Sequence, residues 1–393
     1  MTPGAILALN AGSSSIKFAL FAHGPVRAAH GAIAGIGTAP RFTAAAADGS
    51  ALADRALPAG ATHEALLGTL LDFVATHLPE AKLEAVGHRV VHGGADFAAP
   101  VRVTPAVLAA LEALTPLAPL HQPHNLAPIR ALAATAPTLA QVACFDTAFH
   151  RTLPPLATRF ALPRALHDAG IRRYGFHGLS YAWLAARLRA IAPEVAAGRV
   201  IAAHLGNGAS LCALRAGVSI ETTMGFTALD GLMMGTRCGA LDAGVVLHLL
   251  EQRAMTPAAV SDLLYNRSGL LGVSGISPDM HVLLDSADPR AAEAVALFCA
   301  RIVREAGALA AALGGLDGLI FAGGIGEHAA PVRDAVCAGL GFLGLRLDPA
   351  ANARGARLIS APDSRVAAFV IPTDEEAMIA TEVREVLDGP ATD

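Results

Sequence analysis

A short apolar run that breaks into a polar turn and then resumes occurs twice in this chain, about half a chain apart. In the first copy, residues 6–21, Asn10 precedes the turn, serines fill it and Lys17 follows it. In the second copy, residues 200–215, the tip is Gly206-Asn207-Gly208. Apolar strands joined by Gly, Ser and Asn residues are typical of β-hairpins. The repeat therefore predicts a duplicated fold in which each half presents one turn to a phosphate group.

The first turn has two interpretations. Its backbone N–H groups and serine hydroxyls can bind an anion, and Asn10 can hold a hydrated Mg²⁺. A serine-rich hairpin loop without a ligand explains the same residues equally well. The rarity of lysine favours a ligand, because Lys17 and Lys82 are the only lysines among 29 Lys and Arg residues.

Composition limits the class of protein. The 393 residues are 53% hydrophobic and 16% charged, which predicts an α/β enzyme long enough for two domains and excludes disorder. A net charge of −4 provides no basic field for nucleic acid or for an anionic membrane. The five cysteines are scattered and never form a C-x-x-C pair, which indicates a reducing compartment. With no signal-peptide pattern at the N-terminus, we expect a cytoplasmic location.

Residues 306–326 could be mistaken for a membrane span, because they carry only one charge, Asp317. Glycines interrupt this stretch at positions 314, 315, 323, 324 and 326, and Asp317-Gly318 is a turn signal. We therefore predict a buried helix, a turn and a buried strand.

Helical spacing of apolar residues alternates with the predicted strands, which indicates an α/β architecture. The predicted helices are residues 62–77, 105–114, 179–191 and 290–313, with a last one from 375 to 386 after a cap at Thr373 or Asp374. Prolines interrupt the pattern near residues 147–160. We expect an N-terminal domain over 1–150, a C-terminal domain over 151–371, and a final segment, 372–393, that returns to the first domain.

Four charged or titratable residues stand in turns or at strand ends. Arg89 lies in a short strand-like run before a diglycine, so it needs an anionic partner: a substrate, or simply a nearby Asp or Glu. Asp146 ends a predicted strand, where it could bind a ligand or cap a helix. His177 precedes a helix between glycines, as an anion-binding or a capping residue. Arg237 lies between glycines in a long irregular segment, 220–240.

Several common site types are excluded. The chain has no P-loop motif, no G-x-S-x-G and no protein-kinase signature. Residues 339–344 match G-x-G-x-x-G, but they follow a predicted helix where a Rossmann site requires a strand. His88 and His92 are four residues apart with valines between them, which favours a strand over a helical metal pair.

Taken together, these segments closely resemble the acetate kinase family of the sugar kinase/Hsp70/actin superfamily. The resemblance runs from residue 6 to residue 380. Its motifs are 10–17, 87–94, 145–150, 174–178, 204–210, 224–227, 231–239, 324–327 and 371–376. It implies two actin-like (ribonuclease H-like) domains with ATP in the cleft between them, usually in a homodimer. It also implies reversible, Mg²⁺-dependent transfer of the γ-phosphoryl group of ATP to acetate, giving acetyl phosphate and ADP, with Mn²⁺ as a substitute metal.

The resemblance also implies roles for individual residues. The metal residues would be Asn10 and Glu375, and the catalytic residues Asp146, His177 and Arg237. Acetate would be bound by Arg89, with Val91, Leu120, His121, Phe176 and Ala228 around it. ATP would be bound by Ser13, Ser15, Lys17, His204, Leu205, Gly206, Asn207, Gly208, Asp279, Met280, His281, Gly324, Ile325, Gly326, Glu327 and His328.

Electrostatics agrees with this assignment. Acetate is already an anion at neutral pH, so it needs no general base. The difficulty is to bring it against an equally negative phosphoryl group, and arginines, a histidine, a lysine and Mg²⁺ can offset that repulsion. We therefore expect Asp146 to orient an arginine or Mg²⁺ waters and not to abstract a proton.

Three positions depart from the family pattern and leave alternatives open. Ala228 replaces a proline near the expected methyl pocket, so a propionate or butyrate kinase is the nearest alternative. His281 and His328 replace an arginine and an asparagine on the nucleoside side, which leaves the nucleotide preference open. A more distant alternative is an actin- or Hsp70-like ATPase module that binds protein. A sugar kinase is less favoured, because a hydroxyl nucleophile needs a base and a polar pocket.

Overall fold

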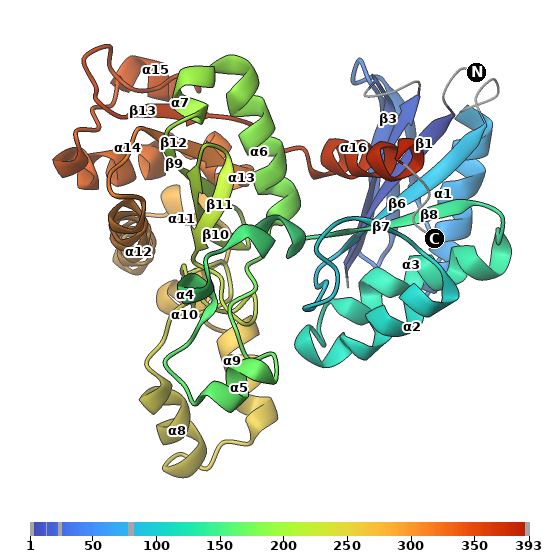
Figure 1. Ribbon diagram of the computed structural model, residues 1–393, viewed down its shortest axis with the longest axis horizontal. Coiled ribbons are helices and arrows are strands. Elements are labelled where there is room, and N and C mark those ends of the chain that lie inside the picture. The colour runs from blue at the N-terminus through green and yellow to red at the C-terminus, as the bar shows by residue number, and fades with distance from the viewer. Residues whose placement is uncertain (1–3, 13, 23–25, 78–81, 390–393) are drawn as a thin grey trace. The chain divides into compact units, whose positions relative to one another are not determined.

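The computed structural model describes residues 4–12, 14–22, 26–77 and 82–389. The chain divides into two compact units, the first made of residues 1–149 with 374–393 and the second of residues 150–373. Each unit contains one mixed β-sheet with helices packed on it (Figure 1). The expectation of an α/β architecture is confirmed.

The sheet of the first unit has the strand order β5-β4-β3-β2-β1-β6-β8-β7. Its strands are β1 (Ala5–Ala11), β2 (Ser15–Ala22), β3 (Val26–Ala34), β4 (Arg41–Ala46), β5 (Ala51–Ala56), β6 (Leu83–Val90), β7 (Val101–Arg102) and β8 (Ala140–Phe145). Its helices are α1 (His63–His77), α2 (Pro105–Ala113), the 3₁₀ helix η1 (Thr115–Leu117), α3 (Gln122–Thr135) and α16 (Glu375–Asp388). The 3₁₀ helix η2 (Ala148–Thr152) crosses the boundary between the units.

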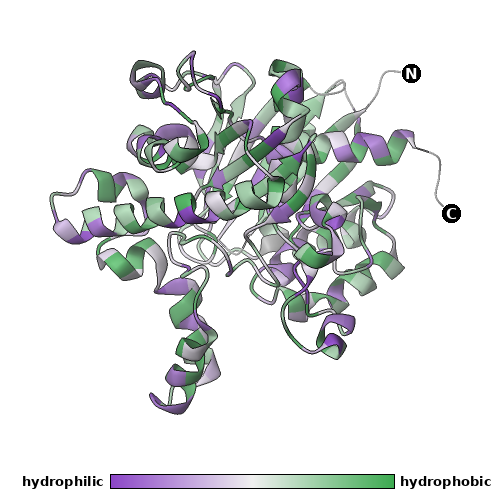
Figure 2. Ribbon diagram, turned by 60° about the vertical axis from the view of Figure 1, so that its left-hand side comes forward, coloured by the Kyte–Doolittle hydropathy of each residue, from purple (hydrophilic) through white to green (hydrophobic). Residues whose placement is uncertain are grey.

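Adjacent residues of β6 point to opposite faces of this sheet, and each face is covered differently. Val86 belongs to the apolar core beneath α1 and α3. Gly87 faces α16, where an added Cβ would lie 2.4 Å from Ile379 and 2.6 Å from Val383. Glycine is therefore required for the close packing of α16, whose alternating polar and apolar turns are visible in Figure 2.

The sheet of the second unit has the strand order β11-β10-β9-β12-β13. Its strands are β9 (Arg199–Leu205), β10 (Ala209–Arg215), β11 (Val218–Thr222), β12 (Gly318–Ala322) and β13 (Ala367–Val370). Its helices are α4 (Pro155–Thr158), α5 (Arg164–Asp168), α6 (Gly178–Ile191), α7 (Pro193–Ala196), α8 (Ala243–Glu251), α9 (Pro257–Asn266), α10 (Gly269–Ser274), α11 (Met280–Leu284), α12 (Pro289–Leu313), α13 (Gly323–His328), α14 (Ala330–Gly339), η3 (Gly341–Leu343) and α15 (Pro349–Ala353).

The two sheets repeat one pattern. In the first, β3-β2-β1 are antiparallel neighbours and β1-β6-β8 are parallel neighbours. In the second, β11-β10-β9 are antiparallel and β9-β12-β13 are parallel. The hairpins β1–β2 and β9–β10 therefore occupy equivalent places, as the repeated sequence pattern predicted.

The apolar stretch 306–326 is interior structure. Helix α12 ends at Leu313, Gly314 follows in the left-handed conformation, and the buried strand β12 begins at Gly318. Buried residues of α12 recur every three or four positions, as in a helix with one face in the core. This confirms the predicted helix, turn and strand. Within the described ranges, we find no helix with the length and apolarity that crossing a bilayer requires.

Candidate functional site

The β1–β2 hairpin brings Asn10 opposite Lys17. The two residues are paired across the strands, and the Gly12 N–H closes the turn by donating to the Ser15 carbonyl at 2.8 Å. The Lys17 side chain is exposed, as expected for a cation that meets a ligand. Ser13, which the sequence also assigns to ATP, lies outside the described residues.

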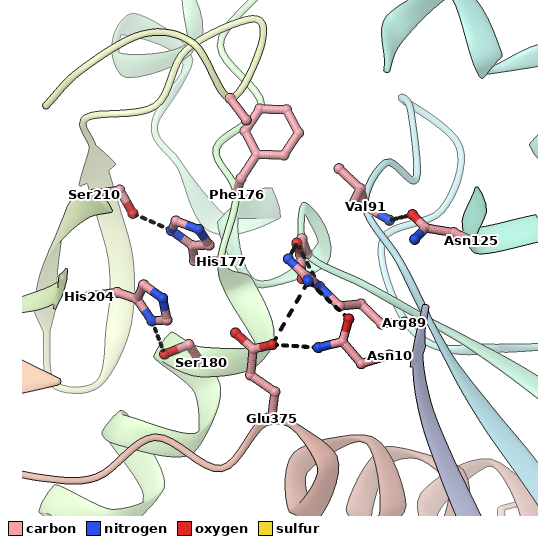
Figure 3. A network of polar contacts seen from close by, with 12 residues as sticks. Asn10, Arg89, Val91, Asn125, Phe176, His177, Ser180, His204, Ser210 and Glu375 are labelled. Carbon is pink, nitrogen blue, oxygen red and sulfur yellow. Dashed lines mark hydrogen bonds and ion pairs between the residues drawn. The ribbon is translucent and has the colours of Figure 1, made fainter. Parts of the chain in front are cut away.

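Arg89 is the centre of a charged cluster in the first unit (Figure 3). Strand β6 carries it beside the end of β8, where Asp146 accepts from Nε at 3.1 Å and from Nη2 at 2.6 Å. Nη1 donates to the Asn10 amide oxygen at 3.1 Å and lies 4.0 Å from Glu375. The Asn10 amide nitrogen in turn donates to Glu375 at 3.1 Å. Four residues that the sequence assigned to one site are thus brought together.

The electrostatics of this cluster follows from its burial. Burial alone would lower the pKa of Arg89, but Asp146 and Glu375 hold it above its ordinary value. Burial raises the pKa of Asp146, with the guanidinium opposing that shift. The bidentate contact stabilises both charged forms. One guanidinium and two carboxylates leave the cluster with a formal charge of −1.

The donor set of this cluster fits Mg²⁺. Asn10 and Glu375 present amide and carboxylate oxygens, which are the ligands Mg²⁺ prefers, and the negative formal charge favours a cation. Among the described residues, there is no group of three or more His, Cys, Asp and Glu arranged to hold a metal. Mg²⁺ commonly uses only one or two protein ligands and completes its shell with water and phosphate.

Asn125 of α3 was missed by sequence reasoning. Its amide nitrogen donates to the Ala11 carbonyl at 2.6 Å, and its amide oxygen accepts from the Val91 N–H at 2.9 Å. It therefore ties the first turn to the end of β6. Among the other predicted substrate residues, Leu120 is 49% exposed and His121 directly precedes α3.

In the second unit, His177 stands immediately before α6 in the left-handed conformation, with φ of 59°. Its Nδ1 lies 2.8 Å from the Ser210 hydroxyl. The ring of His204 stacks on it, with centroids 4.3 Å apart, and the Nδ1 of His204 lies 2.8 Å from the Ser180 hydroxyl. Figure 3 shows both imidazoles held in this way by serines. Ser210 is the last residue of the motif 204–210, whereas Ser180 lies in none of the motifs.

His177 and Arg237 both lie beside Gly208. A Cβ added at Gly208 would lie 3.3 Å from the His177 Nε2 and 3.4 Å from the Arg237 Nη2. The Arg237 Nη1 donates to the Ala228 carbonyl at 2.7 Å. The turn 206–208 of the β9–β10 hairpin is thus flanked by two cationic or hydrogen-donating side chains, an arrangement suited to a phosphate group.

His150 fixes the segment that precedes His177. Its Nε2 donates to the Phe176 carbonyl at 2.9 Å and its Nδ1 accepts from Ser219 at 2.9 Å. Burial lowers the pKa of His150 to about 4, so the ring is neutral near pH 7. Gly175 must be glycine here, because its φ is 78° and an added Cβ would lie 2.6 Å from the His150 ring.

The predicted nucleoside residues lie on two short helices of the second unit. Asp279 caps α11, and His281 on that helix is exposed and pairs with Asp285 at 3.1 Å. Helix α13 contains residues 324–328, and the Glu327 carboxylate accepts from the Gly323 and Thr373 N–H groups.

Helix α13 is anchored by a buried arginine that sequence reasoning missed. Arg333 is 1% exposed and donates to the carbonyls of Gly326 and Glu327 and to Asn352.

The described site residues therefore form two groups, each within one unit. The first unit carries Asn10, Ser15, Lys17, Arg89, Val91, Leu120, His121, Asp146 and Glu375. The second carries Phe176, His177, residues 204–208, Ala228, Arg237, residues 279–281 and residues 324–328.

Comparison with known proteins identifies the family. The model of the acetokinase family matches residues 5–381. An acetate kinase of Rhodopseudomonas palustris is 59% identical over 98% of both chains. The crystal structure of an acetate kinase from Porphyromonas gingivalis is similar, with a TM-score of 0.88, 37% identity, and coverage of 98% of this chain and 100% of that one. A propionate kinase structure from Francisella tularensis gives a TM-score of 0.90, 36% identity and coverage of 97% and 99%.

These matches span nearly the whole chain, so the predicted duplicated, actin-like two-domain α/β fold is confirmed. They also confirm the family suggested by the motifs between residues 6 and 380. This chain belongs to the acetokinase family.

Proposed function

We propose that this chain is a phosphotransferase that moves the γ-phosphoryl group of ATP to acetate, reversibly and by direct in-line transfer. The observation that carries the proposal is the 59% identity with a curated acetate kinase over 98% of both chains. The charged clusters of both units support it, because each is suited to one part of this chemistry.

In the first unit, Arg89 binds the carboxylate of acetate. Each Nη of a guanidinium has two hydrogens, so Arg89 can donate one bond from Nη1 and one from Nη2 besides those to Asn10 and Asp146. Asp146 holds the guanidinium in position through its bidentate contact. Both carboxylate oxygens of Asp146 already accept from Arg89, and acetate needs no proton acceptor. When bound by Asn10 and Glu375, Mg²⁺ would neutralise phosphate charge.

In the second unit, His177 and Arg237 stabilise the charge of the transferring phosphoryl group, and the turn 206–208 holds the phosphates. The support is that both side chains approach Gly208. Residues 279–281 and 324–328 bind the nucleoside. Two anions repel each other at reacting distance, and these donors reduce that cost in the transition state.

Hydroxylamine trapping tests the activity directly. The purified chain with ATP, MgCl₂ and acetate should produce acetohydroxamate, whereas omission of acetate should abolish the product. ATP hydrolysis without any hydroxamate would contradict the proposal and favour an actin- or Hsp70-like ATPase.

Propionate is the second candidate substrate. Two observations favour it: the similarity to a solved propionate kinase, and Ala228 at a position where the family has a proline. An extra methylene in an apolar pocket changes discrimination by about 1–3 kcal/mol, so we expect acetate to be preferred and propionate to be second. Measurement of kcat/KM for C2 to C4 acids tests this order. A larger value for propionate would reverse it.

The variant Ala228→Pro tests whether Ala228 sets the preference between acetate and propionate. If Ala228 widens the pocket, this variant should raise the acetate-to-propionate ratio of kcat/KM by about tenfold. An unchanged ratio would remove Ala228 from substrate selection. ATP and GTP should be compared in the same assay, because His281 and His328 leave the nucleotide preference open.

Four further statements stay predictions: the domain bounds 1–150, 151–371 and 372–393; a homodimer; a cytoplasmic location; and activity with Mn²⁺ in place of Mg²⁺. Gel filtration with light scattering tests the dimer, and metal replacement in the hydroxamate assay tests Mn²⁺.

A further inference from the structure

The side chain of Asn125 joins the ends of strands β1 and β6. Its amide nitrogen donates to the carbonyl of Ala11, the last residue of β1, at 2.6 Å. Its amide oxygen accepts at 2.9 Å from the N–H of Val91, which directly follows β6 (Figure 3). Both donors are certain, because a carbonyl can only accept and a backbone N–H can only donate. Asn125 is 3% exposed, so these two bonds are shielded from water.

The parallel ladder between β1 and β6 stops just before these residues. Its last paired residues are Leu9 and His88. Beyond that pair, the Ala11 carbonyl and the Val91 N–H are joined through the amide of Asn125. One side-chain amide, which has a fixed size, therefore sets the separation of the two strand ends.

The segment that follows β6 is also fixed from other directions. The Val90 carbonyl accepts from the N–H of Asp146, at the end of β8, at 3.1 Å. The His92 carbonyl accepts at 3.1 Å from the buried amide of Gln122, in the first turn of α3. Asn125 therefore ties the end of β1 to a segment that β8 and α3 already hold in place.

Two residues of the charged cluster lie on these strand ends. Asn10 directly precedes Ala11, and Arg89 precedes Val91 by two positions. The Arg89 Nη1 donates to the Asn10 amide oxygen at 3.1 Å. If the strand ends moved apart by about 0.5 Å, this distance would leave the range of a hydrogen bond. The contact between Arg89 and Asn10 thus depends on the separation that Asn125 sets.

We propose that Asn125 is a positioning residue that holds Asn10 and Arg89 at their contact distance. The functional part of this inference rests on the proposed phosphoryl transfer, in which Arg89 binds acetate and Asn10 serves Mg²⁺. A displacement of about 1 Å between groups that must meet in a reaction can lower the rate about 100-fold. Asn125 then affects kcat through these two residues.

Hydrogen exchange in the substrate-free protein, measured at single-residue resolution, tests the two bonds. Asn125→Leu removes both, so the N–H groups of Val91 and Gly12 should exchange about tenfold faster than in the wild type. Asn125→Asp keeps an oxygen for Val91, whose exchange should stay slow. The amides of α1 serve as the internal reference. Wild-type exchange of Val91 in Asn125→Leu, or equally fast exchange of Val91 in both variants, would overturn the proposal.

Steady-state kinetics tests the consequence for the reaction. Asn125→Leu should lower kcat about tenfold or more, with KM for ATP within about twofold of the wild-type value. Gln141→Met is the matched control, because it removes another buried amide of the first unit, one that donates to the Ile129 carbonyl. It should leave both constants nearly unchanged. An equal loss of kcat in Gln141→Met would show that general loosening of the unit is the cause, and would contradict the proposal.

A double-mutant cycle tests whether Asn125 acts through Asn10. In Asn10→Ala, the side chain that Asn125 positions is absent, so adding Asn125→Leu should lower kcat by less than about twofold further. A further loss as large as that in the wild-type background would overturn the positioning role. If Asn125→Leu does not fold, Asn125→Ala replaces it in each experiment with the same expectations, since it also removes both bonds.

This proposal and the proposed function fail separately. Hydrogen exchange is measured without substrates, whereas acetohydroxamate formation reports the activity. Absence of hydroxamate from the wild type, together with the expected exchange pattern, would reject the proposed function and leave the spacing of the strand ends by Asn125 intact.

Discussion

The two units hold their positively charged or hydrogen-donating groups in different ways. In the first, Arg89 is held by the carboxylates of Asp146 and Glu375. In the second, Arg237 donates to a carbonyl, and His177 and His204 are held by serine hydroxyls. Carboxylates orient a cation and also neutralise it, whereas neutral groups orient it and leave its charge to act on a ligand. The first cluster is thus suited to a bound metal with a small carboxylate, and the second to phosphate charge.

The largest expected effect comes from breaking the charge pair of the first unit. Asp146→Ala leaves Arg89, with a side chain 21% exposed, beside a cavity and without its bidentate partner. We expect a loss of about 3–5 kcal/mol in the unfolding free energy of that unit. Hydrogen exchange of peptides from β6 and β8, followed by mass spectrometry, measures it.

Two controls decide whether this loss comes from charge. Arg89→Ala combined with Asp146→Ala should be more stable than Asp146→Ala alone, because it removes a guanidinium that has lost its bidentate partner and is left with Glu375, 4.0 Å away. Ser210→Ala, which removes a neutral contact of the second unit, should cost only about 1–2 kcal/mol. If Asp146→Ala and Ser210→Ala lowered the unfolding free energy equally, the proposed difference between charged contacts in the first unit and neutral contacts in the second would be contradicted.

The second effect concerns catalysis. Arg237→Ala removes a cation beside the turn 206–208, so kcat should fall about 100-fold or more while KM for ATP changes little. Steady-state kinetics of the hydroxamate reaction measures both constants. Arg346→Ala is the control, because Arg346 is two-thirds exposed and pairs with Asp363 on the surface. A near-normal kcat for Arg237→Ala would remove this residue from the mechanism.

The smallest effect concerns the carboxyl group of Glu382 in the first unit. Glu382 of α16 lies beside Cys144, and its Oε2 is buried with no hydrogen-bond partner among the described residues. Burial raises the pKa of Glu382 to about 7, from an ordinary value of 4.5. Because the folded-state pKa is the higher one, the native state loses stability relative to the unfolded chain as pH rises from about 4.5 to 7.

Glu382→Gln removes this penalty. The variant should be more stable than the wild type by about 1–2 kcal/mol at pH 8, and this gain should vanish near pH 4.5. Hydrogen exchange of α16 at both pH values measures it, with peptides of α12 as an internal control. A gain that is the same at both pH values would show that the charge of Glu382 is not its source.

Local features were predictable because residues close in sequence determine them. Apolar spacing of three and four predicted α1 and α2, the glycine before residue 179 predicted the start of α6, and an Ala/Leu-rich stretch predicted α12. Polar tips rich in Gly, Ser and Asn between apolar runs predicted both hairpins. Asp374 caps the last helix as expected, by accepting from the Ala377 N–H. The irregular segment predicted over 220–240 is confirmed from residue 223 on, because no helix or strand occurs between β11 and α8, whereas residues 220–222 belong to β11.

Partners distant in sequence were not predictable from these patterns. The need of Arg89 for an anion was evident, and Asp146 was expected to orient an arginine or Mg²⁺ waters, but that these two residues pair with each other was not predicted. Ser210 lies in the motif 204–210, and Asn125 follows soon after Leu120 and His121, but the atoms that these two side chains reach could not be predicted from those positions.

The sequence by itself determined the family, the alternation of strands and helices, and the kinds of side chain available for chemistry. Those properties depend on spacing over a few residues and on the joint order of motifs. Only the tertiary structure decided which groups touch: Arg89 and Asp146 are 57 positions apart, Tyr181 and Ser210 are 29, and Asn10 and Glu375 are 365. Such contacts depend on strand register and helix packing, and they set whether a charge is neutralised or directed at a ligand.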